Sequence, residues 1–139
     1  MAQSNNNCNP APPAQLEETT GNLNVYGKVL IPCCYEPMTG YFRDGFCRTD
    51  QRDYGVHTVC AVMTQDFLEY SKSRGNDLMT ATSYFPGLKA GDKWCICVSR
   101  WKEAYDAGYA PNVYLDATHI NSLDVVPLSI LEEHAIESN

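Results

Sequence analysis

The order of apolar and polar residues predicts strands and helices in alternation. Residues 56–63 (VHTVCAVM) are apolar and β-branched along most of their length, which is typical of a strand. Residues 65–74 then repeat apolar positions at helical spacing, with Thr64 as the N-cap and Gly75 as the residue that ends the helix. The central part of the chain therefore begins with a strand followed directly by a helix.

The same pattern recurs further along the chain. Residues 94–98 (WCICV) read as a strand, and residues 100–107 read as a helix that Ser99 caps and Gly108 ends. The remaining elements are weaker: strands over 25–31, 112–117 and 123–126 and a helical turn or two over 129–134. Together they predict an α+β or small α/β fold, with a mixed sheet of about four strands, two main helices and long loops rich in Gly and Pro.

The length of 139 residues and a hydrophobic content of 44% fit one domain with a single core. We expect that domain over residues 25–139, because residues 1–24 are polar, contain Asn and Pro runs and read as a disordered tail. No apolar run has the roughly 18 residues that a transmembrane helix needs, so we expect no membrane partner.

The net charge and its distribution limit the kinds of partner that the protein can be expected to bind. The formal net charge is −7, which argues against a large nucleic-acid surface. The acidic excess lies at the two ends, however, because all ten Lys and Arg residues fall within residues 28–102. A small anionic ligand therefore stays open, with Arg43, Arg48 and Arg100 as candidate binding residues. The sequence does not determine the oligomeric state.

The seven cysteines indicate both a compartment and a chemistry. The number is odd, and residues 1–24 resemble neither a secretory signal nor a transit peptide, so we expect a cytoplasmic protein without a disulfide framework. Cys95 and Cys97 lie two apart on a strand and face the same side. With Cys33 and Cys47 from the loop before residue 56, they are candidate ligands for zinc or iron, although small buried cysteines in a core remain the simpler explanation.

A reactive thiol is another interpretation of the same residues. Cys47 and Cys60 are the candidate nucleophiles, and His57 and His119 are the candidate bases. His57 and Cys60 point to opposite faces of one strand, so His57 needs a partner from elsewhere, for which the preceding loop is placed suitably. If the sheet is parallel, the carboxyl ends of its strands form a second candidate cluster of Thr64, Ser99, Arg100, Thr118 and His119.

Several strings of the sequence resemble one known family. They include TGYFRDGFC (39–47), HTVCAVMT (57–64), FPGLKAGDKWCIC (85–97) and ATH (117–119). In this combination and order they are similar to a bacterial family catalogued as domain of unknown function 2237, over about residues 25–127. The resemblance implies one domain in a soluble cytoplasmic protein, and it brings no activity, cofactor or catalytic residue.

Three functions remain after these observations. The first is a domain whose Cys, His and Arg residues line a pocket for a small ligand or metal, the second is a thiol-dependent enzyme, and the third is an interaction module with structural cysteines. Phosphate loops, dinucleotide-binding glycine patterns, G-x-S-x-G elbows and H-E-x-x-H helices do not occur in the chain, which excludes the enzyme classes that depend on them.

Overall fold

The computed structural model describes residues 22–136, and the fold is of the α+β class. Two strands, β1 (His57–Val62) and β2 (Lys93–Cys97), form the sheet, and the helices are α1 (Gln65–Ser73), α2 (Val98–Ala107) and α3 (Leu128–Glu132). Two short 3-10 helices, η3 (Leu115–Ala117) and η4 (Ile120–Asp124), lie between α2 and α3. Of the predicted polar tail over residues 1–24, the part up to residue 21 lies outside the described residues.

The sheet differs from the prediction in size and direction. Within residues 22–136, β1 and β2 pair antiparallel in a two-stranded sheet, where the sequence predicts a mixed sheet of about four strands. The segments 25–31 and 112–117 contribute isolated bridges and a 3-10 turn instead, and 123–126 includes the end of η4. The segment around Val113 does lie beside β1, where the Val62 N–H donates to Asn112 O and the Tyr114 N–H to Cys60 O, but only the single bridge Ala61–Val113 forms before the chain turns into η3.

Both main helices begin and end close to the predicted residues. The Thr64 hydroxyl accepts a hydrogen bond from the Phe67 N–H at 3.0 Å, which satisfies one of the four N–H groups that a helix leaves unpaired at its start. The helix α2 begins two residues before the prediction, because Cys97 rather than Ser99 is the N-cap residue. It ends at Gly108, whose φ of 89° is the left-handed conformation that glycine adopts without strain.

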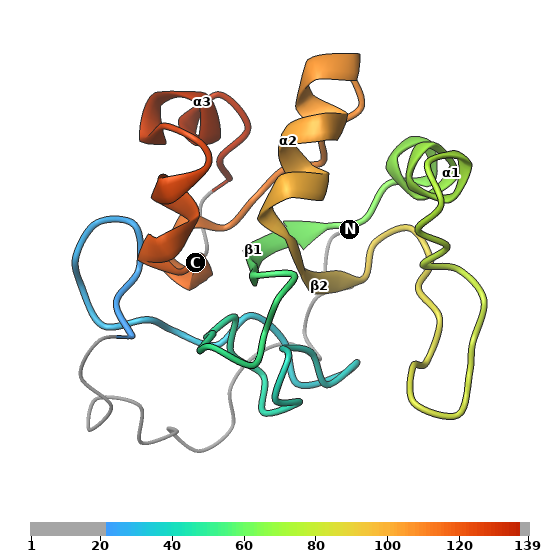
Figure 1. Ribbon diagram of the computed structural model, residues 1–139, viewed down its shortest axis with the longest axis horizontal. Coiled ribbons are helices and arrows are strands. Elements are labelled where there is room, and N and C mark those ends of the chain that lie inside the picture. The colour runs from blue at the N-terminus through green and yellow to red at the C-terminus, as the bar shows by residue number, and fades with distance from the viewer. Residues whose placement is uncertain (1–21, 137–139) are drawn as a thin grey trace.

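The two faces of the sheet contact different parts of the chain. The helix α2 stands over the strands, with α1 on one side and α3 on the other, while residues 22–56 run past the far side of the sheet (Figure 1). The main core lies between the helices and the sheet and includes Val59, Ile96, Phe67 and Trp101. A second cluster, against the loops, consists of Cys33, Cys47, Cys60, Cys95 and Ala117. Alternation along each strand therefore separates an aliphatic face from a cysteine face.

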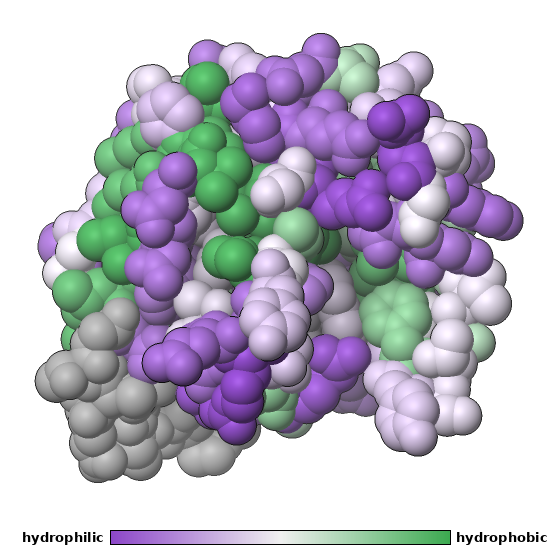
Figure 2. Space-filling view, in the orientation of Figure 1, coloured by the Kyte–Doolittle hydropathy of each residue, from purple (hydrophilic) through white to green (hydrophobic). Residues whose placement is uncertain are grey.

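The outer surface is polar over α1, and apolar side chains gather over α3 in the same view (Figure 2). None of the helices in residues 22–136 is long and apolar enough to cross a membrane.

Candidate functional site

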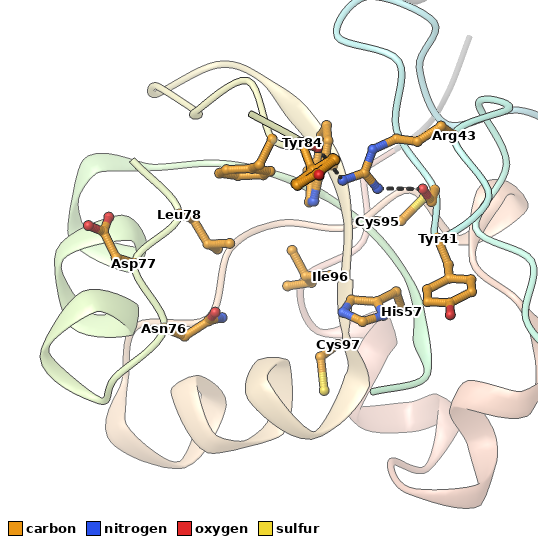
Figure 3. Close-up of a pocket in the computed structure, with 13 residues that line it drawn as sticks. Tyr41, Arg43, His57, Asn76, Asp77, Leu78, Tyr84, Cys95, Ile96 and Cys97 are labelled. Carbon is orange, nitrogen blue, oxygen red and sulfur yellow. Dashed lines mark hydrogen bonds between the residues drawn. The ribbon is translucent and has the colours of Figure 1, made fainter. Parts of the chain in front are cut away.

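A cavity of about 580 Å³ lies beside β2. Its walls come from three segments distant in sequence: the 40–43 loop, the 76–85 connection, and β2 with the adjacent His57 (Figure 3). Long loops line the cavity and a strand supports it. This arrangement is typical of functional sites, in which loops carry the binding residues on a rigid scaffold.

The side chain of His57, at the edge of the cavity, is oriented by Asp53. Its Nδ1 atom lies 2.6 Å from Oδ1 of Asp53, and its backbone N–H donates to Oδ2 of the same carboxylate at 2.8 Å. The Thr49 hydroxyl donates to that Oδ2 as well, at 3.0 Å. The Asp53 side chain is fully buried, so these donors compensate the cost of burying its charge. The carboxylate therefore holds the imidazole with Nδ1–H as donor and leaves Nε2 for the cavity.

The turn before β1 is shaped to hold this ring. Val56 has a φ of 53°, a conformation that β-branched residues adopt only when the surrounding structure compensates the strain. A Cβ atom on Gly55 would lie 2.6 Å from Cε1 of His57, so the absence of a side chain at position 55 provides the space for the imidazole. Both features place His57 at the edge of the cavity.

A register irregularity brings Cys97 opposite His57. The pairs are Cys60 with Cys95 and Val59 with Ile96, and the next pair is His57 with Cys97, so Thr58 has no partner on β2. Such a bulge redirects the neighbouring side chains, and directly opposed residues of an antiparallel pair have Cα atoms about 4.5 to 5.5 Å apart. Both His57 and Cys97 line the cavity.

Cys97 has a free thiol and is half-buried. It is the N-cap residue of α2, and no side-chain cap hydrogen bond engages its sulfur, which points toward the first turn of that helix (Figure 3). Helix N-termini and neighbouring imidazoles stabilise thiolates.

The opposite wall combines aromatic rings with one cation. The Arg43 guanidinium lies 5.0 Å from the centre of the Trp94 ring and donates to the backbone carbonyls of Gly40 and Tyr84, at 2.8 and 3.3 Å. Within residues 22–136 no carboxylate pairs with Arg43. Its charge therefore stays available to an anionic group in the cavity.

The comparison with known families assigns the chain. Residues 23–135 match the profile of the bacterial family domain of unknown function 2237, described as uncharacterized proteins conserved in bacteria. The chain belongs to this family. No curated protein matches it. The matched range of this DUF2237 protein contains every residue that lines the cavity, His57 and Cys97 included, and also Asp53 behind His57, so the site lies within the family domain.

The other candidate binding residues of the DUF2237 protein lie in ion pairs. Arg48 pairs with Asp44 at 2.6 Å, and Arg100 pairs with Glu103 at 3.4 Å, and neither arginine lines the cavity. The structure thus places one of the three candidate arginines, Arg43, at the cavity.

His119 lies apart from the cavity and has a structural environment. It is 2% exposed; its Nδ1 accepts from the Asn121 N–H, and its Nε2 lies 3.1 Å from Oδ1 of Asn22. Burial lowers the pKa of this imidazole below its usual value. The second candidate cluster, which includes His119, assumed parallel strands; because β1 and β2 run antiparallel, their carboxyl ends lie at opposite ends of the sheet.

Disulfides correct the expectation that this DUF2237 protein has none. Cys33 is bonded to Cys60 and Cys47 to Cys95, over sequence separations of 27 and 48 residues. The odd cysteine count misled the prediction, because one thiol, Cys97, remains unpaired beside these bonds. The candidate nucleophiles Cys47 and Cys60 therefore carry no free thiol here.

The predicted metal set is also rearranged. Of Cys33, Cys47, Cys95 and Cys97, the first three meet in the buried cysteine cluster, where Cys60 takes the fourth place. Cys97 lies in the cavity instead.

Sequence reasoning missed Asp53 and Cys97 as partners of His57. The D-x-x-x-H spacing of Asp53 and His57 was the available local signal, whereas nothing local marks the bulge.

Proposed function

We propose that this protein is a thiol-dependent enzyme in which Cys97 is the nucleophile, His57 the general base and Asp53 the residue that orients the base. The observation that carries the proposal is that a buried carboxylate orients an imidazole at the edge of the cavity, and that the residue paired with this histidine across the sheet carries an unpaired thiol and lines the same cavity. A nucleophile, a base and a third group that orients the base are the components that thiol and hydroxyl enzymes of unrelated folds share.

The reaction class that fits these groups is acyl transfer to water. Nε2 of His57 takes the proton from the Cys97 thiol, and the sulfur attacks the carbonyl carbon of the substrate. A C–S bond forms, and the carbonyl electron pair moves onto oxygen. When the tetrahedral intermediate collapses, the leaving group takes the proton from His57 and a thioester remains. Water, deprotonated by His57, then attacks the thioester, and Cys97 regains its proton from His57 as the acid is released.

Two groups near the thiol can stabilise the negative oxygen. The first turn of α2 carries N–H groups that lack intrahelical acceptors; the N–H of Val98 donates to the Val56 carbonyl at 3.1 Å, so the N–H groups of Ser99 and Arg100 are the candidates. The Asn76 side chain lies across the cavity from His57, with its carboxamide directed toward Ile96 and Cys97 (Figure 3). N–H donors of both kinds form oxyanion holes in acyl-transfer enzymes.

The cavity wall suggests what kind of substrate enters. Arg43 provides an unpaired positive charge on the rim, and the rings of Trp94, Phe85 and Tyr84 provide apolar area. Such a wall favours an acyl compound that carries both an anionic group and an apolar part. The prediction of a small anionic ligand is thereby kept, with Arg43 as the binding residue.

Selective alkylation of Cys97 tests the proposed base. The rate of iodoacetamide addition to Cys97, followed by peptide mass spectrometry, is compared with the rate for glutathione at the same pH. We expect Cys97 to react faster than glutathione, and His57→Gln to remove that advantage. His134→Gln is the matched control, because His134 packs against Trp101 and Tyr105 away from the cavity.

Acylation tests the reaction class. With p-nitrophenyl acetate we expect one acetyl group on Cys97 in the intact mass, release of p-nitrophenol, and later loss of the acetyl group to water. A Cys97 thiol that reacts no faster than glutathione in the wild-type protein, or that reacts equally fast in His57→Gln, would overturn the proposal.

The cytoplasmic location predicted from the sequence belongs to this proposal. A reducing compartment keeps a nucleophilic thiol active, and glutathione and thioredoxin also keep other cysteines there reduced, so that disulfides are rare. In such a compartment Cys33, Cys47, Cys60 and Cys95 would be thiols. Another link would then be needed to hold the loops of Cys33 and Cys47 against β1 and β2.

A further inference from the structure

Four cysteines converge on the face of the sheet that lies against the loops. Cys60 on β1 and Cys95 on β2 are direct cross-strand partners, and Cys33 and Cys47 reach them from the preceding loops. Three sulfurs, those of Cys33, Cys47 and Cys60, therefore lie within 4.8 Å of one another, and the fourth, that of Cys95, adjoins them through its bond to Cys47.

Among the described residues, the potential metal ligands that gather at this point are all cysteines. All four side chains are between 0 and 3% exposed, and the described neighbours in the cluster are Ala117 and the half-buried Tyr114. The backbone N–H groups of the two strand cysteines donate to the hydroxyls of threonines, Cys60 to Thr118 at 3.1 Å and Cys95 to Thr39 at 2.8 Å. The group thus offers sulfur ligands fixed by a hydrogen-bonded backbone.

We propose that the reduced protein binds one Zn²⁺ through Cys33, Cys47, Cys60 and Cys95. Zinc in a structural site takes four ligands in a tetrahedron, with Zn–S distances of about 2.3 Å and therefore about 3.8 Å between sulfurs. The bonded pairs have Cα–Cα distances of 5.7 and 5.2 Å, so side-chain rotation is enough to spread the sulfurs around an ion. Soft thiolates without nearby carboxylates select zinc over magnesium or calcium.

The two forms interconvert by balanced steps. A phosphine reductant supplies two electrons to each disulfide, takes up oxygen from water and becomes the phosphine oxide, which leaves four thiols. Zinc binding then releases four protons as four Zn–S bonds form. In the reverse direction, two molecules of hydrogen peroxide oxidise the four thiolates to two disulfides, yield four waters once four protons are taken up, and release the ion.

The zinc site takes over the structural task of the disulfides. Both bonds attach the loops that contain Cys33 and Cys47 to β1 and β2, and a four-coordinate ion attaches the same segments at the same points. The 40–43 wall of the cavity lies between these two cysteines, so either form holds that wall against β2. The proposal is independent of catalysis, because Cys97 is not a member of the group.

Cobalt titration of the reduced protein tests this site. Protein reduced with a water-soluble phosphine under nitrogen and freed of metal is titrated with Co²⁺, which takes the same tetrahedral thiolate geometry and has visible ligand-field bands. We expect saturation at one equivalent, with intense bands typical of tetrahedral cobalt and thiolate charge-transfer absorption, followed by displacement of Co²⁺ by Zn²⁺. The oxidised protein should bind neither ion at this site.

Single serine variants identify the ligands. We expect Cys60→Ser and Cys33→Ser to weaken Zn²⁺ binding by at least about tenfold and to shift the cobalt spectrum, whereas Cys97→Ser, the matched control, leaves both unchanged. Where a variant is unfolded without metal, circular dichroism during zinc addition gives the same answer, because metal binding is coupled to folding. The proposal is overturned if the reduced wild-type protein neither binds nor refolds with one equivalent of zinc, or if Cys97→Ser abolishes binding.

Discussion

Replacing Asp53 by asparagine keeps the size of the side chain and reverses one hydrogen bond. At present Oδ1 faces Nδ1 of His57 at 2.6 Å, and Oδ2 accepts from the Thr49 hydroxyl and the His57 backbone N–H. An asparagine can place its oxygen where two donors meet, so its NH₂ group must face Nδ1. The imidazole then accepts at Nδ1 and carries its proton on Nε2. In that tautomer Nε2 cannot take the proton of Cys97.

The size of the effect follows from the number of contacts. Hydrogen bonds to charged groups contribute about 1.5 to 3 kcal/mol and neutral ones about 0.5 to 1.5. Because removal of a buried charge offsets part of the weakened bonding, we expect a loss of about 1 to 3 kcal/mol in the free energy of unfolding. The reaction loses its base, for which a decrease of about 10² to 10⁴ in the acylation rate is expected.

The assay is acylation of Cys97 by p-nitrophenyl acetate, with the folded fraction checked by urea denaturation. Asp50→Asn is the matched control: Asp50 lies in the same loop, accepts from the Arg52 N–H at 2.8 Å and does not touch His57. We expect the control to retain the wild-type acylation rate. A folded Asp53→Asn variant that is acylated as fast as the wild type would refute the reasoning.

Three further predictions concern space, pH and the core. Gly55→Ala should displace the His57 ring, because the new Cβ would lie 2.6 Å from Cε1, and should lower Cys97 acylation by about tenfold or more while retaining most of the stability, as measured by urea denaturation. Burial lowers the pKa of His119 in the folded protein, so as the pH falls below about 6.5 the unfolded chain takes up a proton at His119 before the folded protein does. The thermal midpoint should therefore decrease as the pH is lowered from 7.5 to 5, and it should decrease less steeply in His119→Gln. Leu68→Ala, at a site with 0% exposure, should cost about 2 to 5 kcal/mol in denaturant unfolding with alkylation of Cys97 unchanged in the folded protein, and a cost below about 1 kcal/mol would contradict its place in the core.

Local signals in the sequence were sufficient for the helices. Thr64 and Gly108 act within one turn of the residues that they cap, so the start of α1 and the end of α2 followed from neighbours in the chain, whereas the start of α2 at Cys97 did not. The partner of His57 was also local, because Asp53 lies four residues earlier in the same loop. The direction of β2 relative to β1, by contrast, could not be predicted from neighbouring residues. It depends on the path of the long connection after α1, and no short pattern records that path.

What the sequence alone determined is therefore an α+β chain with two capped helices, two apolar strands and reactive residue types in its loops. The tertiary structure decided which of those residues meet. Thr58 bulges out of the ladder and brings His57 opposite Cys97, and residues separated by 27 and 48 positions join as Cys33–Cys60 and Cys47–Cys95. The reason is physical: helix caps and alternation depend on neighbours a few residues away, whereas pairing and register depend on how the whole core packs.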